Sequence, residues 1–410
     1  MTSPDVVLEN HTLVVRDGRI LDLLPSAEAR LRYAPTMHVD RPEHLLLPGL
    51  VNAWTRTMPA AGRFAGLRRP VDGALLCMAE MLRAGTTCFS DVGYFPDESA
   101  RLAAEQGMRI LVGIPIAAAS SPWAGSADEC LTRALRFRDE FRGHPTIGTV
   151  FAPLGACGID DVAFGRVATL ANELDAGIVI ALHESRSEIE ECVAHHGLRP
   201  IERLQSLGLL TPALTAVHMV HVNAADIALA QRSAIAVSLC PGSSLRRGFG
   251  APPVPAWVGS GLRLGAGTGV ETSAASLDLW SELKLLALLS RTPQPGGAAL
   301  RAWDAIAVAT RGGAAALGLD AEIGTLETGK WADLCCVDLA GPALLRAFLH
   351  EPAPDPIAAL VFNAGRDTVN DVWVAGRQLL NGGAFTRLDW PELAARVQAR
   401  PNPATTGERS

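Results

Sequence analysis

Short apolar segments alternate with amphipathic segments between about residues 48 and 320 of this chain of 410 residues. The expected strands are 86–92, 109–116, 147–152, 177–182, 214–218, 234–240 and 262–267, and the expected helices include 74–84, 97–107 and 126–142. This alternation is typical of parallel strands joined by helices. The length suits a barrel of about 250 residues with one satellite domain. The sequence therefore predicts an α/β fold in which residues 48–320 form a (β/α)8 barrel.

The two ends of the chain have a different pattern. Residues 5–47 contain short alternating segments around the turn Asp17-Gly18, which is typical of a β-hairpin. Residues 321–384 contain similar short segments broken by glycine pairs. Neither end is long enough to bury a core of its own. We therefore expect residues 1–47 and 321–400 to build one small discontinuous β-sandwich domain, and residues 401–410 to form a flexible tail.

Composition limits the classes of partner. The net charge is −7 and no basic block occurs, so nucleic acid and anionic membranes are poor partner predictions and a small-molecule ligand is the better one. Hydrophobic residues make up 48% of the chain, yet no run of 18 apolar residues and no signal-like N-terminus occurs, which predicts a cytoplasmic protein. The eight cysteines lack metal-finger spacing and are expected to be reduced. A homo-oligomer is an open alternative.

The stretch LPGLVNAWTRT, residues 47–57, reads as the first barrel strand. Apolar residues lead into polar ones at alternate positions, at the end where a barrel presents its side chains to the catalytic mouth. Trp54 and Arg56 lie two residues apart and should enter this mouth together. A guanidinium forms planar paired hydrogen bonds, and an indole offers a broad face. We therefore expect Trp54 and Arg56 to bind a planar small molecule that is anionic or carries a carbonyl group, unless they merely fill the barrel.

Four segments carry a resemblance to a known family. They are LPGLVNAWTRT, IALHESRSEIEE, LTAVHMVHVNAADIALA and AIAVSLCPGSSLRRGFGAP. Together they resemble the amidohydrolase superfamily, in particular its methylthioadenosine and S-adenosylhomocysteine deaminases and chlorohydrolases. The resemblance implies a (β/α)8 barrel, a small β-sandwich made from both chain ends, and a divalent metal at the barrel mouth.

The resemblance implies a set of positions that a metal-dependent deaminase uses to hold the metal or to touch the substrate, and most of them are replaced here. The replaced positions, on the better alignment, are Trp54, Arg56, Leu154, Ala181 and Gly269. Glu184 and His218 match the family, and one imidazole with one carboxylate is too small a ligand set for zinc. The sequence therefore predicts no metal and no cofactor, with zinc as the alternative.

The remaining histidines and one further glutamate leave choices open. His183 aligns with the family ligand only if the match of Glu184 is lost, so either Ala181 or His183 occupies that position. His183 is a catalytic candidate, or else a rim histidine bonded to a loop. His221 and Glu271 are candidates for substrate binding, and Glu271 could supply a carboxylate if the last barrel loop were rebuilt.

Three functions follow from these residues. The first is a metal-independent enzyme in which Glu184, His218 and His183 act as acid and base on a small planar, heterocyclic or amide-bearing substrate. The second is a non-catalytic ligand-binding or regulatory protein on the same barrel. The third is a zinc-dependent hydrolase or deaminase with relocated ligands, which would be His183, His218, Glu184 and Glu271.

Overall fold

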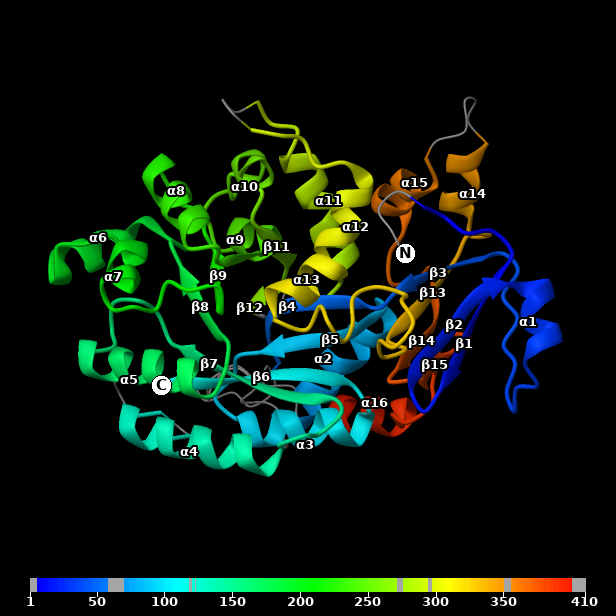
Figure 1. Ribbon diagram of the computed structural model, residues 1–410, viewed down its shortest axis with the longest axis horizontal. Helices are drawn as coiled ribbons and strands as arrows, with labels where there is room; N and C mark the ends of the chain where they lie inside the picture. The colour runs from blue at the N-terminus through cyan, green and yellow to red at the C-terminus, as the bar shows by residue number, and fades with distance from the viewer. Residues whose placement is uncertain are drawn as a thin grey trace.

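A computed structural model describes residues 6–57, 70–117, 120–121, 123–270, 276–293, 297–349 and 355–399. Strands of these residues form a large parallel sheet, a five-stranded antiparallel sheet and a two-stranded hairpin. Helices cover the outside of the large sheet (Figure 1).

The large sheet is a closed barrel. Its strands, in sequence and spatial order, are β4 (Leu50–Arg56), β5 (Thr86–Asp91), β6 (Arg109–Ile116), β7 (Ile147–Pro153), β8 (Ile178–Leu182), β9 (Leu214–His218), β10 (Ala236–Leu239) and β11 (Arg263–Ala266). Strand β11 pairs with β10, and its continuation β12 (Gly269–Val270) pairs with β4. Each neighbour is parallel, so the predicted (β/α)8 barrel is confirmed.

The helices follow the strands as the sequence predicts. They are α2 (Pro70–Arg83), α3 (Pro96–Gln106), α4 (Ala127–Glu140), α5 (Asp161–Glu173), α6 (Arg186–His196), α7 (Pro200–Ser206), α8 (Ala224–Arg232), α9 (Pro241–Arg246), α10 (Val254–Ser260), α11 (Leu279–Leu289), α12 (Ala302–Val308) and α13 (Arg311–Ala316). Local chemistry sets several ends: the Ser126 hydroxyl accepts the Glu129 N–H at the start of α4, and Gly107 ends α3 in the left-handed region.

Residues on each barrel strand alternate between two apolar cores. One face packs outward against the helices, and the other fills the barrel. The inner core includes Val51, Cys88, Leu111, Val150, Val179 and Val217. Because this interior is packed with side chains, chemistry is restricted to the end of the barrel where the strands stop.

The two chain ends meet in the antiparallel sheet. Strand β3 (His44–Pro48) pairs with β13 (Leu334–Asp338), followed by β14 (Val369–Val374), β15 (Arg377–Asn381) and β16 (Ala384–Phe385). The hairpin β1 (His11–Arg16) and β2 (Arg19–Pro25) turns at Asp17-Gly18 as predicted. A backbone bridge from Arg19 to Trp331 joins it to the C-terminal part. The exact domain boundaries stay a prediction.

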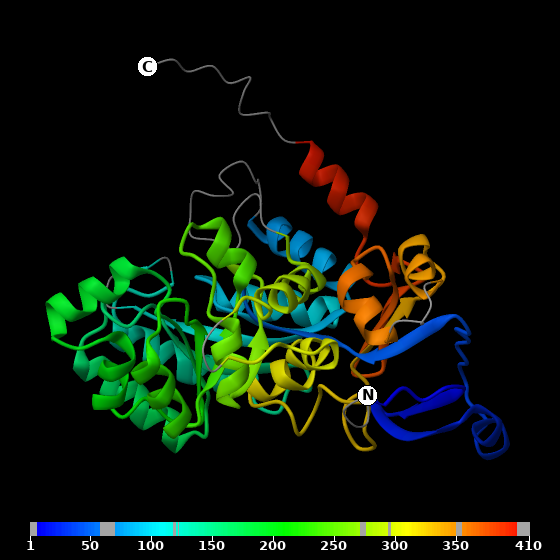
Figure 2. The same cartoon turned by 90° about the horizontal axis from the view of Figure 1, so that it is seen from above.

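Four helices near the ends were not predicted: α1 (Ser26–Arg32), α14 (Pro342–Phe348), α15 (Pro356–Asn363) and α16 (Trp390–Gln398). Helix α15 buries Ile357, Leu360 and Val361 on one face. A short apolar run of this kind is equally typical of a β-strand, which explains why the sequence did not predict this helix. Figure 2 shows the hairpin and α1 at one end of the molecule and helices α5 to α8 at the other.

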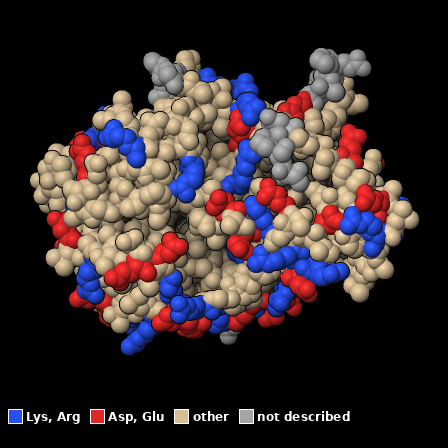
Figure 3. Space-filling view, in the orientation of Figure 1, with Lys and Arg blue, Asp and Glu red and all other residues tan. Residues whose placement is uncertain are grey.

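Hydropathy and surface charge bear on whether the protein could span a membrane or bind nucleic acid. No helix among the described residues is both long and apolar enough to cross a membrane. Figure 3 shows Lys and Arg side chains interspersed with Asp and Glu on the face in view, without the broad basic area that nucleic-acid binding uses. The predicted tail, 401–410, lies outside the described residues.

Candidate active site

Trp54 enters the barrel because strand β4 is irregular near its end. The pairing of β4 with β5 changes register between Asn52 and Thr55. Such a bulge re-aims side chains. Trp54 is 3% exposed and joins the inner core, which also includes Cys240 and the partly buried Leu154 and Ala181. Three of the positions replaced relative to the family, 54, 154 and 181, thus belong to one apolar cluster.

Arg56 lies next to the ends of β4 and β5. Its Nε donates to the Val92 carbonyl at 2.7 Å, and its guanidinium carbon lies 5.4 Å from the Tyr94 ring centre. The neighbouring Thr57 donates its N–H and its hydroxyl to the buried carboxylate of Asp91, at 2.8 and 2.7 Å. Burial raises the pKa of Asp91, against the hydrogen bonds and the charge of Arg56, which lower it. Asp91 therefore anchors the backbone that carries Arg56.

Glu184 follows β8 and forms an ion pair with Arg247, which comes directly after α9. The Glu184 side chain is 18% exposed. Its backbone N–H donates to Oε2 of Glu188 at 2.6 Å, and the N–H of His183 donates to Oε1 at 3.2 Å. Burial raises the pKa of Glu188 to about 7. One carboxylate thus fixes the backbone at the end of β8.

His183 is fully buried and both ring nitrogens have backbone partners. The Ile201 N–H donates to Nε2 at 3.2 Å, so Nδ1 carries the proton toward the His221 carbonyl, also at 3.2 Å. Burial lowers the pKa of His183 to about 4. These contacts favour the alternative of a histidine bonded to a loop. The catalytic role of His183 stays a prediction.

His218 ends β9 in a left-handed conformation, with φ 72°. Its Nδ1 lies 3.3 Å from the Ser244 hydroxyl, and its buried Nε2 has no hydrogen-bond partner in the described structure. Burial lowers the pKa of His218 to about 4, so the ring is neutral near pH 7. His218 pairs with Leu182 across β8 and β9, which puts Glu184 two residues beyond that pair. Within the described residues no hydrogen bond or ion pair joins Glu184 to His218.

Gly269, one of the replaced positions expected from the family resemblance, begins strand β12. Its φ is 80°, a region that side-chain-bearing residues rarely adopt. A Cβ there would overlap the Cβ and hydroxyl of Ser243 on α9. The conformation at 269 thus excludes a side chain. Glu271 lies outside the described residues, and His221 contributes its backbone carbonyl, which also accepts from Arg199 at 3.0 Å.

Several residues that shape this mouth carry no clear functional signal in the sequence. In the sequence, Glu188 is one of several glutamates in the segment IALHESRSEIEE, Arg247 is one of two adjacent arginines, and Asp91 is the last polar residue of its expected strand. Glu282 on α11 is a further buried carboxylate, and it accepts the Gly242 N–H at 2.8 Å. Burial raises the pKa of Glu282 to about 7. An acidic residue within an apolar helix is the signal that could have identified it.

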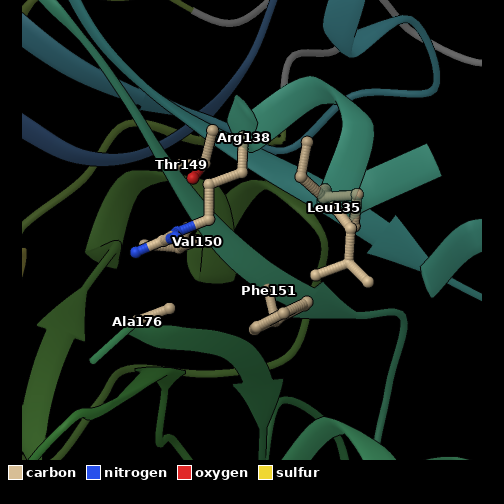
Figure 4. A pocket seen from close by; sticks show the side chains of 8 residues that line it. Leu135, Arg138, Thr149, Val150, Phe151 and Ala176 are labelled. Atoms are coloured by element: carbon tan, nitrogen blue, oxygen red, sulfur yellow. The ribbon is translucent and has the colours of Figure 1, made fainter. Parts of the chain in front are cut away.

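A crevice seen in Figure 4 lies elsewhere. It is between α4 and strands β6 and β7, outside the barrel, and its lining includes Leu135, Arg138 and Phe151. Arg138 donates to the Leu174 carbonyl at 2.7 Å. Its apolar lining and its place make it a packing gap between helix and sheet, away from the residues of the mouth.

The family is established by comparison with known proteins. Residues 46–379 match the model of the amidohydrolase family, and the chain belongs to that family. A 5-methylthioadenosine/S-adenosylhomocysteine deaminase of Teredinibacter turnerae is 35% identical over 95% of this chain and 92% of its own length. One from Saccharophagus degradans is 32% identical over 95% and 91%. The chain is a hydrolase-like enzyme of this family.

Solved structures agree on the fold. An adenosine deaminase from Xanthomonas campestris, solved with bound zinc, is 36% identical, with a TM-score of 0.88 over 96% of this chain and 94% of that one. An atrazine chlorohydrolase from Arthrobacter aurescens TC1, complexed with zinc, reaches 0.82 over 96% and 95% at 20% identity, which supports the fold alone.

The zinc in these structures corrects one prediction. The expectation that the protein has no cofactor is contradicted, because a structure 36% identical over nearly the whole chain holds zinc. The residues described in this chain do not by themselves fit such an ion, since no group of three His, Cys, Asp or Glu side chains that could hold a metal occurs among them. His183 has two backbone partners, Glu184 pairs with Arg247, and position 269 has no side chain. These side chains are therefore not assigned as ligands of a metal ion.

Proposed function

We propose that this enzyme hydrolyses the ring amino group of a small planar heterocycle, of the class for which its relatives are named, to a ring carbonyl and ammonia. The observation that carries the proposal is the placement of Glu184 just past the end of β8 and of His218 at the end of the neighbouring strand β9. Carboxylate and imidazole are the usual groups for acid and base work. The mouth of a (β/α)8 barrel is where such enzymes place them.

Glu184 is the proton carrier in this proposal. In hydrolytic deamination water adds to the ring carbon, the C–N bond breaks, and a proton passes from water to the leaving ammonia. A partly exposed carboxylate can accept that proton and return it. Arg247 and the Glu188 carboxylate hold its side chain and backbone in place. His218 is neutral, and its free Nε2 can accept or donate one hydrogen bond to the reacting group.

Trp54 and Arg56 are proposed to bind the substrate. The indole lies in the inner core and the guanidinium lies at the strand end beyond it. His221 and Glu271 remain proposed binding residues. A substrate that combines a flat ring with an anionic or carbonyl group suits this pair.

The proposal is tested by incubating the purified enzyme with adenosine, 5'-methylthioadenosine and S-adenosylhomocysteine. Ammonia and the mass of the product are measured, with zinc added in one arm and a chelator in another. We expect ammonia and the ring carbonyl product from at least one substrate, and loss of both in Glu184→Gln. The exposed Glu173→Gln on α5 is the matched control. The difference between the two arms measures the part that a metal ion plays.

Saturable binding without turnover in both arms would contradict the proposal and favour the non-catalytic binding protein. One observation favours a non-catalytic binding protein: Trp54, Leu154, Ala181 and Cys240 pack together in one apolar cluster. The cytoplasmic location and a homo-oligomeric state stay predictions of the sequence.

A further inference from the structure

The ring of His218 has one hydrogen-bond partner among the described residues, the Ser244 hydroxyl on α9, which lies 3.3 Å from Nδ1. The backbone beside it is held independently: the Met219 N–H donates to the Leu182 carbonyl at 3.0 Å, and the Trp257 indole donates to the Met219 carbonyl at 3.2 Å. The ring is fully buried, and its Nε2 is unpaired in the described structure. The direction of Nε2 therefore depends on the contact between Nδ1 and Ser244.

The position of Ser244 depends on how α9 begins, directly after β10. Cys240 at the N-cap makes no side-chain hydrogen bond, and Pro241, the first helical residue, has no N–H. Gly242 therefore carries the first N–H of the helix, and such terminal N–H groups need a partner outside the helix. The Ser244 N–H donates to the Cys240 carbonyl at 3.0 Å, so the hydroxyl lies one helical turn from that start.

Glu282 on α11 supplies the missing partner. Its Oε2 accepts the Gly242 N–H at 2.8 Å, and its side chain is 2% exposed. The fit is close, because a Cβ at position 242 would come within 2.2 Å of Oε1. Burial raises the pKa of Glu282, whereas the Gly242 N–H and the charge of Arg246, whose Nη1 lies 4.0 Å from Oε1, lower it. A carboxyl group keeps an acceptor oxygen whether or not it is protonated, so this anchor does not depend on the charge.

We infer that Glu282 and Ser244 are positioning residues for His218: Glu282 fixes the start of α9, and the Ser244 hydroxyl holds Nδ1 so that Nε2 faces the reacting group. This inference rests on the proposed function, because the direction of Nε2 affects catalysis only if His218 contacts the substrate. A neutral imidazole carries its proton on either of two nitrogens, and a hydroxyl bonded to Nδ1 selects one of these tautomers. Neither positioning residue needs to touch the substrate.

The test observes the ring of His218 directly. Protein labelled with ¹⁵N at its histidines is studied by NMR near neutral pH with a chelator present, so that no bound metal ion holds the ring. The His218 signals are those that His218→Asn removes. A single neutral tautomer gives two well-separated ring nitrogen signals, whereas exchange between tautomers brings them together. We expect full separation in the wild type and loss of most of it in Ser244→Ala. Ser243→Ala removes a buried hydroxyl that has no hydrogen-bond partner in the described structure, and this matched control should keep the separation.

The link to Glu282 is tested from both sides of the contact. Glu282→Met removes the acceptor, and Gly242→Ala displaces it with the added Cβ. Both should bring the His218 signals together in protein whose circular dichroism matches the wild type, and Gly242→Ala alone decides if Glu282→Met does not fold. Glu282→Gln keeps an acceptor oxygen and should preserve the separation.

Three spectra would overturn the inference. Separated signals in Ser244→Ala would exclude its hydroxyl as the group that holds the ring. Separated signals in Gly242→Ala, and in Glu282→Met where it folds, would exclude Glu282. A wild type whose signals have already converged would exclude both residues.

Turnover distinguishes this inference from the proposed function. With 5'-methylthioadenosine, Ser244→Ala and Gly242→Ala should lower kcat roughly ten- to a hundredfold with KM nearly unchanged, and Ser243→Ala should lower neither. The expected spectra without any turnover by the wild type would refute the proposed function and leave the positioning of His218 in place. Turnover with equal kcat in the wild type, Ser244→Ala and Gly242→Ala would overturn the inference and leave the proposed function standing.

Discussion

The carboxylate of Glu188 accepts the backbone N–H of Glu184 through Oε2 at 2.6 Å and that of His183 through Oε1 at 3.2 Å. A side chain on the first turn of α6 therefore fixes the backbone of the proposed proton carrier. The Glu188 side chain is half-buried, and this burial raises the pKa of its carboxyl group to about 7.

This raised pKa predicts a pH-dependent stability. Between the ordinary pKa of a glutamate and about 7, the folded protein keeps a proton that the unfolded chain has lost. The contribution of Glu188 to stability is therefore present below that window and is lost as pH rises through it. Urea unfolding from about pH 5 to about pH 8 should show that Glu188→Gln reduces this loss. Glu190→Gln, exposed on the same helix, is the control, and parallel curves for the wild type and Glu188→Gln would contradict the account.

For His218 we expect the opposite dependence of folding stability on pH. Burial lowers its pKa to about 4, so between about 4 and the ordinary pKa of histidine the unfolded chain binds a proton that the folded protein does not. Its contribution to stability is therefore lost as pH falls through that window. In the same unfolding experiment His218→Asn should lose less stability than the wild type on acidification. His195→Asn, an exposed histidine on α6, should follow the wild type. Equal acid sensitivity of the wild type and His218→Asn would show that the buried neutral ring is not responsible.

How much of this site the sequence predicts depends on how local each contact is. The barrel strands follow from alternation along the chain, whereas the place of Trp54 also depends on an irregularity of β4 that alternation does not predict. The partners of His183 do not follow from alternation, because Ile201 on α7 and His221 after β9 lie 18 and 38 positions away along the chain and meet it only in the folded barrel. The pairing of Glu184 with Arg247 joins residues 63 positions apart, and the bulge at Trp54 depends on the register with β5.

Arg56 is expected to contribute to ligand binding by its charge. Arg56→Met should weaken the binding of an anionic or carbonyl-bearing ligand by about 1.5–3 kcal/mol, which is roughly tenfold to over a hundredfold. Calorimetric titration measures the change, and circular dichroism checks the fold. Arg346→Met, exposed on α14, should have no effect. If Arg56→Met and Trp54→Leu both leave affinity unchanged, the pair only fills the barrel.

Gly269 is expected to tolerate no side chain. Gly269→Asp should destabilise the fold by more than about 1–3 kcal/mol, because the strain of its φ of 80° is joined by overlap with Ser243. Gly143→Ala, at a φ of 74° with nothing within 4 Å of the added Cβ, isolates the cost of the backbone conformation alone. The double variant with Ser243→Gly should recover part of the loss in chemical denaturation. A stability of Gly269→Asp equal to that of Gly143→Ala would show that Ser243 does not close this position.

The most direct test of the account is the rate of ammonia release from 5'-methylthioadenosine by the wild type, Glu184→Gln and Glu173→Gln, at equal concentration and with zinc present. The account predicts release by the wild type and by Glu173→Gln, and a loss of roughly a hundredfold or more in Glu184→Gln, as expected when an acid and base group is removed. Equal rates in all three proteins would contradict the central claim that Glu184 at the end of β8 carries the proton in this enzyme.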